Sequence, residues 1–179
     1  MTGRERVIAA IEHRDPGGVA VDFGGTMVTG MHVLCVEKLR DRYGLEKRPG
    51  KVCDPYQMLG EIEDDLLDAL GADTVMLPPP NTMFGFRNEH WKEWRAPWGQ
   101  ELLVSGHFRT TVKDNGDVLI YPGGDTDAPP SGHMPYDGFF FDTIIRQDPI
   151  DEDALDPADN LQEFGPISDD DLDYYRREA

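Results

Sequence analysis

The apolar residues near the start of the chain follow two different spacings, which predict a helix and then a strand. Residues 2–14 place their apolar side chains on one helical face, and Thr2 and Glu5 have the spacing of a capping box. Pro16 ends this pattern, because proline cannot continue a helix. Residues 19–23 (VAVDF) then form a short apolar run before a glycine pair, which is typical of a buried strand.

The next part of the chain continues this alternation. Residues 30–43 and 56–70 carry apolar side chains at helical spacing, and Gly71 is placed to end the second helix. Between them, residues 50–55 fit either a connection or a short strand. Residues 72–77 (ADTVML) form another mostly apolar run, so the order strand, helix, helix, strand predicts parallel strands joined by right-handed crossovers.

The pattern changes after residue 84, where the apolar runs become short and are separated by turns. The DNGD sequence at 114–117 predicts a tight hairpin between strands at 108–113 and 118–121. We therefore expect an antiparallel β-hairpin region at about 84–138, inserted into the alternation of strands and helices. Residues 139–141 (FFF) then predict a return to a strand.

The last part of the chain is strongly acidic. Residues 148–173 contain eleven Asp or Glu and no Lys or Arg. Ser168 followed by three Asp residues is typical of a helix start, because acids in the first turn interact favourably with the helix dipole. The predicted helix runs to Ala179 without a capping residue, so we expect residues 1–179 to be the N-terminal part of a longer domain.

The acidic composition excludes several kinds of partner. The chain has 179 residues and a formal net charge of −18, whereas nucleic acids and anionic membrane surfaces require clustered Lys and Arg. It contains no run of about 18 apolar residues, and its first residues lack the apolar core of a signal peptide. Together with only two cysteines, Cys35 and Cys53, these features indicate a cytoplasmic protein with two free, buried thiols.

Short segments along nearly the whole chain match one enzyme superfamily in their order and spacing. The segments are TGRERV (2–7), EH (12–13), VDFGGT (21–26), QML (57–59), LGAD (70–73), WG (98–99), YPGGD (121–125) and PSG (130–132). They resemble the uroporphyrinogen decarboxylase superfamily, and most closely its methyltransferase-like branch, which is related to the corrinoid-dependent methyltransferases.

The resemblance implies an α/β fold in which residues 1–179 form about the first half of a TIM (β/α)8 barrel. The hairpin region would then be an insertion in the barrel, and the acidic segment 148–173 would follow it. Half a barrel leaves a parallel strand edge without a partner. We therefore expect a chain that is either marginally stable or paired with another copy as a homo-oligomer.

The resemblance also implies a chemistry. Members of the methyltransferase-like branch move a methyl group between a small donor or a corrinoid protein and a thiol, which a zinc ion held by His and Cys activates. That zinc site belongs to the other half of the family fold. We therefore expect a small-molecule substrate but no metal and no cofactor in this portion, with zinc and a corrinoid partner in the full-length protein.

Two alternatives stay open. Uroporphyrinogen decarboxylases, the lyases of tetrapyrrole biosynthesis, bind substrate carboxylates with Arg in the loop after the first strand, but residues 24–30 contain no Arg. They also carry an essential Asp after the next strand, where residues 77–80 read LPPP. The second alternative is a non-catalytic binding or oligomerising fragment.

Five residues are candidates for a functional site. Asp22 and His32 flank the first predicted turn from strand to helix, and we predict catalytic roles for both, as a base and as an acid, base or hydrogen-bond donor. The competing interpretations are an Asp that caps the turn and a His that packs at the helix end. Asp125, Ser131 and His133 lie in a loop rich in Gly and Pro, and we predict that they bind substrate rather than only form turns.

Other kinds of site find no support in the sequence. The two cysteines and His32 do not have the spacing of zinc ligands. No phosphate-binding loop and no nucleophile motif occurs. Trp91, Trp94 and Trp98 are predicted to pack in the hairpin region rather than to form the wall of a substrate site.

Overall fold

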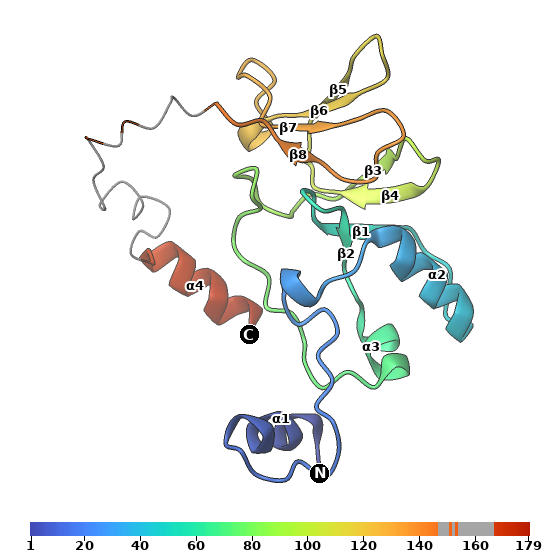
Figure 1. Cartoon of the computed structure of the whole chain (residues 1–179), viewed down its shortest axis with the longest axis vertical. Coiled ribbons are helices and arrows are strands. Elements are labelled where there is room, and N and C mark those ends of the chain that lie inside the picture. Colours follow the sequence, from blue (N-terminus) through green and yellow to red (C-terminus); the bar gives the residue numbers. More distant parts are fainter. Residues whose placement is uncertain (147–150, 152, 154–166) are drawn as a thin grey trace.

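The computed structural model describes residues 1–146, 151, 153 and 167–179. The helices are α1 (Gly3–Ile11), α2 (Val33–Tyr43), α3 (Asp64–Leu70) and α4 (Asp169–Glu178), with 3-10 turns η1 (Met27–Thr29) and η2 (Pro122–Gly124). The strands are β1 (Gly50–Asp54), β2 (Leu59–Gly60), β3 (Lys92–Arg95), β4 (Glu101–Val104), β5 (Thr110–Val112), β6 (Val118–Ile120), β7 (Gly132–Met134) and β8 (Asp142–Thr143). Figure 1 shows the strands gathered toward one end of the long axis and α1 at the other.

The strands form two small four-stranded sheets. One has the order β2-β1-β4-β3 and the other has the order β5-β6-β7-β8. Among the described strand pairs only β1 and β4 run parallel, with Gly50 opposite Leu102 and Lys51 opposite Leu103. All the others are antiparallel. From β3 to β8 the strands follow one another without an intervening α-helix.

This architecture corrects the predicted fold. The prediction of a partial TIM barrel is wrong, because a barrel requires parallel strands that are each followed by a helix, and the described chain has two mixed or antiparallel sheets instead. The stretch at 84–138, which was expected to be an insertion, contains β3 to β7 and so supplies most of the strands. Short connections such as these can join only antiparallel strands.

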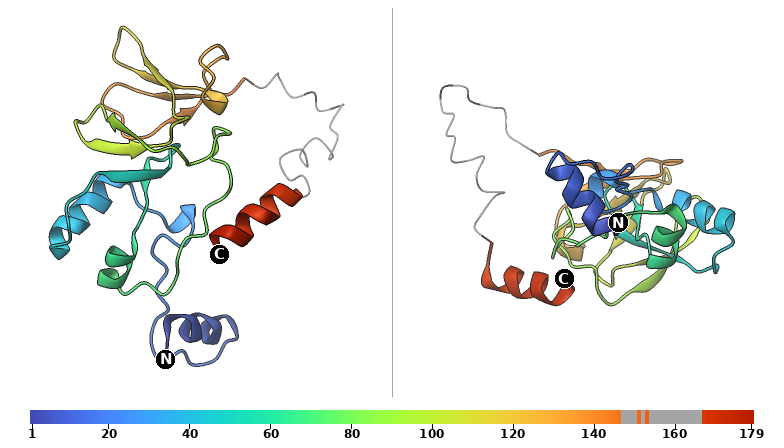
Figure 2. Two further views of the ribbon diagram at one scale, coloured as in Figure 1. Left: turned by 180° about the vertical axis from the view of Figure 1, so that it is seen from behind. Right: turned by 90° about the horizontal axis from the view of Figure 1, so that it is seen from below.

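The two segments predicted as parallel strands, residues 19–23 and 72–77, belong to neither sheet, and both run as plain loops between α1 and the body of the molecule (Figure 2). They do lie side by side. The Asp73 N–H donates to the Val21 carbonyl at 2.8 Å, and the Asp73 carboxylate accepts from the Val21 N–H at 2.9 Å. A buried parallel strand needs cover on both faces, whereas Val19 and Val75 are 84% and 73% exposed.

Two further predicted elements differ from the structure. The helix expected at 56–70 is present only from Asp64, because Met58 adopts a positive φ of 52° and the following residues pair with β1 as β2. The strand expected at 139–141 is also absent. There the Phe141 N–H donates to the Tyr56 carbonyl at 2.9 Å and the Phe141 ring is buried, and β8 begins only after it.

Predictions that rested on local signals are confirmed. Thr2 and Glu5 form the expected capping box at the start of α1, and Ser168 begins α4 in the same way. Gly71 ends α3 in the left-handed conformation, with φ 67° and ψ 35°. The DNGD turn connects β5 and β6 as an antiparallel hairpin. None of the described helices combines the length and the apolar composition that a membrane crossing would require.

The core joins α2 to both sheets. Its buried apolar side chains are Val33, Val52, Met58, Phe84, Phe86, Ala96, Leu102, Val104, Phe108, Val118, Ile120, Met134 and Phe141. Phe141 meets Phe84 and Phe108 edge-to-face, with ring centroids 6.1 and 6.2 Å apart. Trp94 and Trp98 pack against this core, as predicted.

The buried side chain of Arg40 joins α2 to α3. It donates two hydrogen bonds of 2.8 Å to the two carboxylate oxygens of Asp65, and two more, at 3.1 and 2.8 Å, to the Glu46 carbonyl. Arg48 also binds Asp65 at 2.8 Å. The hydrogen bonds from Arg40 are the main reason that the pKa of Asp65 falls to about 2.

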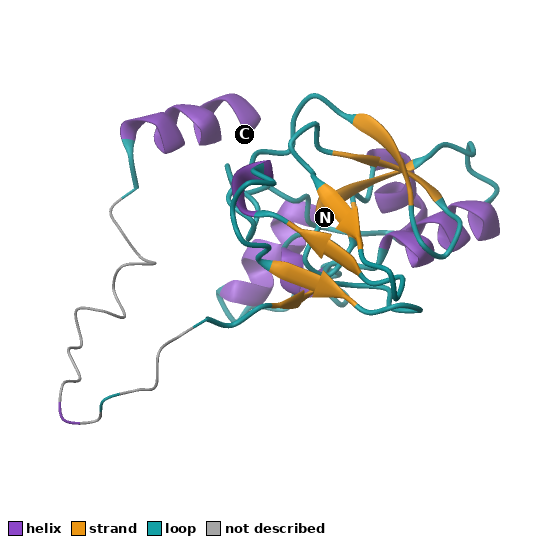
Figure 3. Ribbon diagram, turned by 90° about the horizontal axis from the view of Figure 1, so that it is seen from above, coloured by secondary structure: helices purple, strands orange, loops and turns teal. Residues whose placement is uncertain are grey.

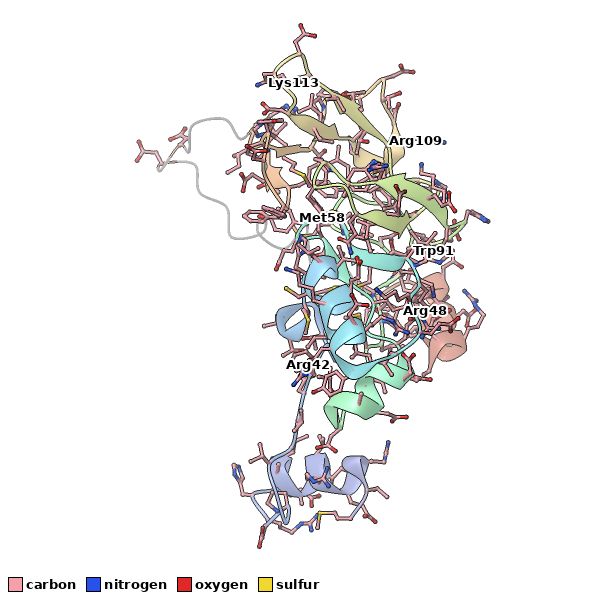
Figure 4. The ribbon with its side chains drawn as sticks, turned by 90° about the vertical axis from the view of Figure 1, so that its right-hand side faces the viewer. Arg42, Arg48, Met58, Trp91, Arg109 and Lys113 are labelled. Carbon is pink, nitrogen blue, oxygen red and sulfur yellow. The ribbon has the colours of Figure 1, made fainter. Side chains whose placement is uncertain are left out.

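Replacing Arg40 tests this link. Arg40→Met is expected to lower the free energy of unfolding by about 2 kcal/mol, because it removes the hydrogen bonds that the buried guanidinium donates to Asp65 and to the Glu46 carbonyl, although Asp65 keeps its bond from Arg48. Arg42→Met is the control, since Arg42 is exposed on the same helix (Figure 4) and its loss should cost less than about 0.5 kcal/mol. Urea denaturation measures both, and equal stabilities of the two variants would contradict the role of Arg40.

Candidate functional site

A cavity of about 680 Å³ lies where the end of β1, the segment before β3 and helix α4 come together. Seen from above, α4 lies to one side of the sheets (Figure 3). The cavity has an apolar wall of Ile62, Val75, Met76, Pro78 and Pro80. Trp91 and Tyr174 add aromatic rings, and the cations Lys51, Arg87 and Arg177 line it as well. Cavities of this size and mixed character are typical of small-molecule sites.

Several of the carboxylates that line the cavity are already paired. Glu61 lies 3.3 Å from the Lys51 ammonium, and Glu63 lies 2.7 Å from the Arg48 guanidinium. Glu89 accepts from the His107 ring at 3.1 Å. Arg87 and Arg177 take part in no ion pair within the described part of the chain. Among the described residues, the cavity lining therefore contains two cations, Arg87 and Arg177, and two carboxylates, Asp64 and Glu178, that form no ion pair.

Cys53 also lines the cavity, but its thiol is unsuited to nucleophilic chemistry. Burial, reinforced by the charges of Asp54 and Glu61, raises its pKa to about 12, and it donates to the Leu59 carbonyl at 3.4 Å. A protonated thiol is neither a nucleophile nor a zinc ligand. Cys35 is exposed, contrary to its predicted burial, and both thiols are free. Within the described residues no three His, Cys, Asp or Glu side chains could hold a metal ion, and the family resemblance places its zinc site in the other half of the fold.

Asp22 holds together the turn in which it was predicted to act. One of its carboxylate oxygens accepts hydrogen bonds from the Thr74 hydroxyl at 2.7 Å, the Gly25 N–H at 3.0 Å and the Thr29 hydroxyl at 3.2 Å. The bond from Thr74 is the largest cause of its lowered pKa. A carboxylate with a lowered pKa is a weaker base, so this arrangement fits the turn-capping interpretation better than the catalytic one.

His32 is the N-cap residue of α2, and both of its ring nitrogens are engaged. Nδ1 accepts from the Leu34 N–H at 3.2 Å, and Nε2 lies 2.8 Å from the Phe139 carbonyl. Because a carbonyl oxygen can only accept, Nε2 carries the proton and the ring is the neutral tautomer. The ring also packs against Trp98, with centroids 5.4 Å apart. This geometry leaves no nitrogen free for proton transfer and fits the packing interpretation.

His133 is paired with Asp117 rather than aimed at a cavity. The His133 Nε2 and an Asp117 carboxylate oxygen are 2.8 Å apart, which connects β7 to the turn between β5 and β6. Asp117 also accepts from the Tyr136 N–H at 2.9 Å and from the Asn115 amide at 2.8 Å. The bond to His133 is the largest cause that lowers the pKa of Asp117 to about 2.

Asp125 and Ser131 occupy turns beside the second sheet. A carboxylate oxygen of Asp125 accepts from the Asp127 N–H at 2.9 Å, which is the hydrogen bond of a local turn. The Ser131 backbone bonds to Ile120 and Ile144, at 2.8 and 2.9 Å, and so extends the strand pairing. Neither residue lines the cavity, and neither do Asp22, His32 and His133.

The sequence did not single out the residues that do line the cavity, except Trp91 and Cys53, which were predicted to pack and to be a free, buried thiol. Lys51, Arg87 and Tyr174 come from three separate parts of the chain, and only the tertiary structure brings them together. Single charged residues in loops or at helix ends carry no spacing signal. The sequence did offer one sign of the cavity. Arg176 and Arg177 are basic residues in the last turn of α4, which is otherwise acidic.

The pairing of His133 with Asp117 predicts a specific response to acid. Because the pKa of Asp117 in the folded chain is about 2, below its ordinary value of 3.8, Asp117 stabilises the fold above about pH 4, and this contribution is lost as the pH falls toward 2. Asp117→Asn should therefore be less stable at neutral pH and should lose less stability over that acidic interval. Asp114→Asn, at an exposed acid in the same turn, is the control. Urea midpoints measured across this range would refute the assignment if Asp117→Asn followed the parent curve.

The described residues thus form a cavity, while the predicted catalytic side chains lie elsewhere and make hydrogen bonds to the surrounding structure. Such a cavity can select and orient a small molecule, but its lining contains no nucleophile with an adjacent base. A comparison of the chain with protein-family models, curated proteins and solved structures finds no match.

Proposed function

We propose that this chain is the small-molecule-binding portion of an enzyme similar to the uroporphyrinogen decarboxylase superfamily. Within that superfamily it belongs with the methyltransferase-like branch, which moves a methyl group between a small donor or a corrinoid protein and a thiol. The observation that carries the proposal is the cavity of about 680 Å³, which is lined by apolar and aromatic side chains and by charged side chains of both signs. The role assigned to this portion is binding, and no step of the transfer is assigned to Cys53.

The methyl-transfer chemistry is supported by the order of the short sequence matches and not by the fold. The barrel that the resemblance implied is not what the described residues form. Decarboxylation of a tetrapyrrole has less support, because residues 24–30 form a turn around Asp22 and contain no Arg to bind substrate carboxylates. The methyltransferase hypothesis requires no Arg in residues 24–30.

The proposal is tested by assaying the natural gene product for methyl transfer from methylcobalamin to a small thiol, with the thioether detected by mass spectrometry. We expect turnover that stops when zinc is removed. Trp91→Ala should raise the KM for the methyl donor at least about fivefold by removing a cavity wall, whereas Arg42→Ala, which lies outside the cavity, should leave it unchanged. A gene product without zinc and without turnover would refute the methyltransferase, and decarboxylation of uroporphyrinogen would establish the alternative.

A second candidate function, a non-catalytic oligomerising fragment, is favoured by a group of exposed apolar side chains. Val19, Val28, Val75, Leu77 and Met83 are all exposed, and they belong to the segments that form no sheet. Exposed apolar side chains that gather into one patch commonly mark a contact with another protein. In this function the same segments would be covered by a second copy of the chain.

Sedimentation velocity distinguishes the oligomerising fragment from a monomeric binding module. If a second copy covers these segments, the parent chain sediments as a dimer, and Val75→Asp converts it to a monomer because a buried charge opposes association. Val112→Asp is the matched control, since Val112 is similarly exposed but lies on β5 of the other sheet. A parent chain that stays monomeric at all concentrations and melts cooperatively would refute the oligomerising function.

A further inference from the structure

We infer that helix α4 is a movable cover of the cavity, which is closed while α4 packs on it and open when α4 separates from the body of the molecule. The inference rests on the cavity that carries the proposed function, but it concerns access to that cavity and no step of methyl transfer. It is tested on the chain without ligand or turnover, so its failure is distinct from a failure of the enzyme assay.

Helix α4 packs over the cavity with three of its side chains, Tyr174, Arg177 and Glu178. Figure 4 shows α4 on the same side of the molecule as Trp91, which lines the same cavity. In the described part of the chain, the hydrogen bonds and the ion pair of α4 all join residues within 168–179. Side-chain packing over the cavity therefore holds α4, without a polar link to the sheets.

The packing of α4 differs from that of α2, which is firmly attached to the core. Val33, Val36 and Arg40 of α2 are buried, whereas no residue of α4 is buried and its Leu172 side chain is 39% exposed. Segments with few buried contacts open at a low free energy, without unfolding of the whole domain. We therefore expect α4 to open far more often than α2.

The helix itself also depends partly on its packing. It has 10 residues, whereas an isolated helix in water needs about 12 to 15 residues to be even marginally stable. The capping box of Ser168 and Asp171 and the basic residues Arg176 and Arg177 in the last turn stabilise the helical form locally. Tyr174 adds to this by packing at the cavity, where burial raises the pKa of its hydroxyl. The backbone hydrogen bonds of α4 are therefore expected to open when the helix separates from the body.

The two surfaces that meet at the cavity are both acidic. Helix α4 carries five carboxylates and two arginines. The lining on the body of the molecule contains four carboxylates and two cations, which are Glu61, Glu63, Asp64, Glu89, Lys51 and Arg87. Surfaces of like charge repel each other, and salt screens that repulsion. We therefore expect α4 to pack more tightly as the ionic strength rises, whereas a helix held by ion pairs would loosen.

Hydrogen exchange of the whole chain, followed by mass spectrometry, tests the cover. The amides of α4 should be protected at least about a hundredfold less than those of α2. Raising the ionic strength from about 0.01 M to about 0.15 M shortens the Debye length from about 30 Å to about 8 Å, and should slow exchange in α4 at least about twofold. Tyr174→Ala should abolish this slowing. Tyr175→Ala is the control and should retain it, because Tyr175 is on the same helix but does not line the cavity.

The variant Glu61→Gln isolates the contribution of charge. It removes one carboxylate from the lining, so α4 should exchange at least about twofold more slowly at low ionic strength than in the parent chain. Glu61 lies 3.3 Å from the Lys51 ammonium. Glu101 lies 3.4 Å from the Arg95 guanidinium and outside the cavity lining, so Glu101→Gln is the matched control and should not change the exchange of α4.

A second measurement reports whether Trp91 is covered. In the chain labelled with fluorotryptophan, the fluorine resonance of Trp91, assigned from Trp91→Phe, should shift with ionic strength in step with the exchange of α4. The resonance of Trp98, which packs against the core, should not shift. Three results would overturn the inference: protection of α4 equal to that of α2, exchange of α4 that salt quickens or leaves unchanged, or a Trp91 resonance that stays fixed while α4 responds. Thermal melting of each variant shows whether the body of the molecule is still folded.

Discussion

The parallel pairing of β1 with β4 is the contact on which the rest of the structure depends. It joins residues 52 positions apart, and it places Val52 and Leu102 in the same core as Val33 of α2. The absence of a side chain at Gly50 allows this, because a Cβ there would lie 2.6 Å from a methyl group of Val33. The end of β1 then carries Cys53 to the cavity wall. The cavity therefore depends on the pairing of β1 with β4, and residues close to either strand in the sequence do not determine that pairing.

This dependence explains which parts of the fold the sequence could predict. The capping box of α1 and the DNGD hairpin are decided by residues three or four apart, and both are present. The partner of each strand is decided by contacts between distant segments, which apolar spacing does not report. The run at 72–77 has the composition of a buried strand, yet it makes a single backbone bond to residues 19–23 and has no cover on its faces. The composition of residues 72–77 is compatible with a strand, but no neighbouring segment pairs with them or covers them, so they form a loop.

The candidate site shows the same limit in chemical terms. Asp and His are good catalytic groups, but they are also good caps, because their side chains can bond to nearby backbone N–H groups. Asp22 and His32 are used in this second way, by Gly25 and Leu34 respectively. A sequence pattern places such residues next to turns in either case, so only the hydrogen-bond partners separate the two roles. Arg87 shows the opposite case. The sequence gave no reason to expect it in a site, yet it lines the cavity and forms no ion pair with a described residue.

The cavity wall and the exposed apolar surface are parts of one segment, and this connects binding to association. Val75 lines the cavity, while Leu77 on the same segment is exposed and available to a second protein surface. The segment is held mainly through Asp73 and Thr74, which bond to Val21, Arg6 and Asp22. A segment with few apolar contacts has low local stability, so a ligand or a second copy that orders it must offset that ordering entropy. A ligand in the cavity and a second copy of the chain would both cover the Val75 side chain, so the two are expected to compete for this segment.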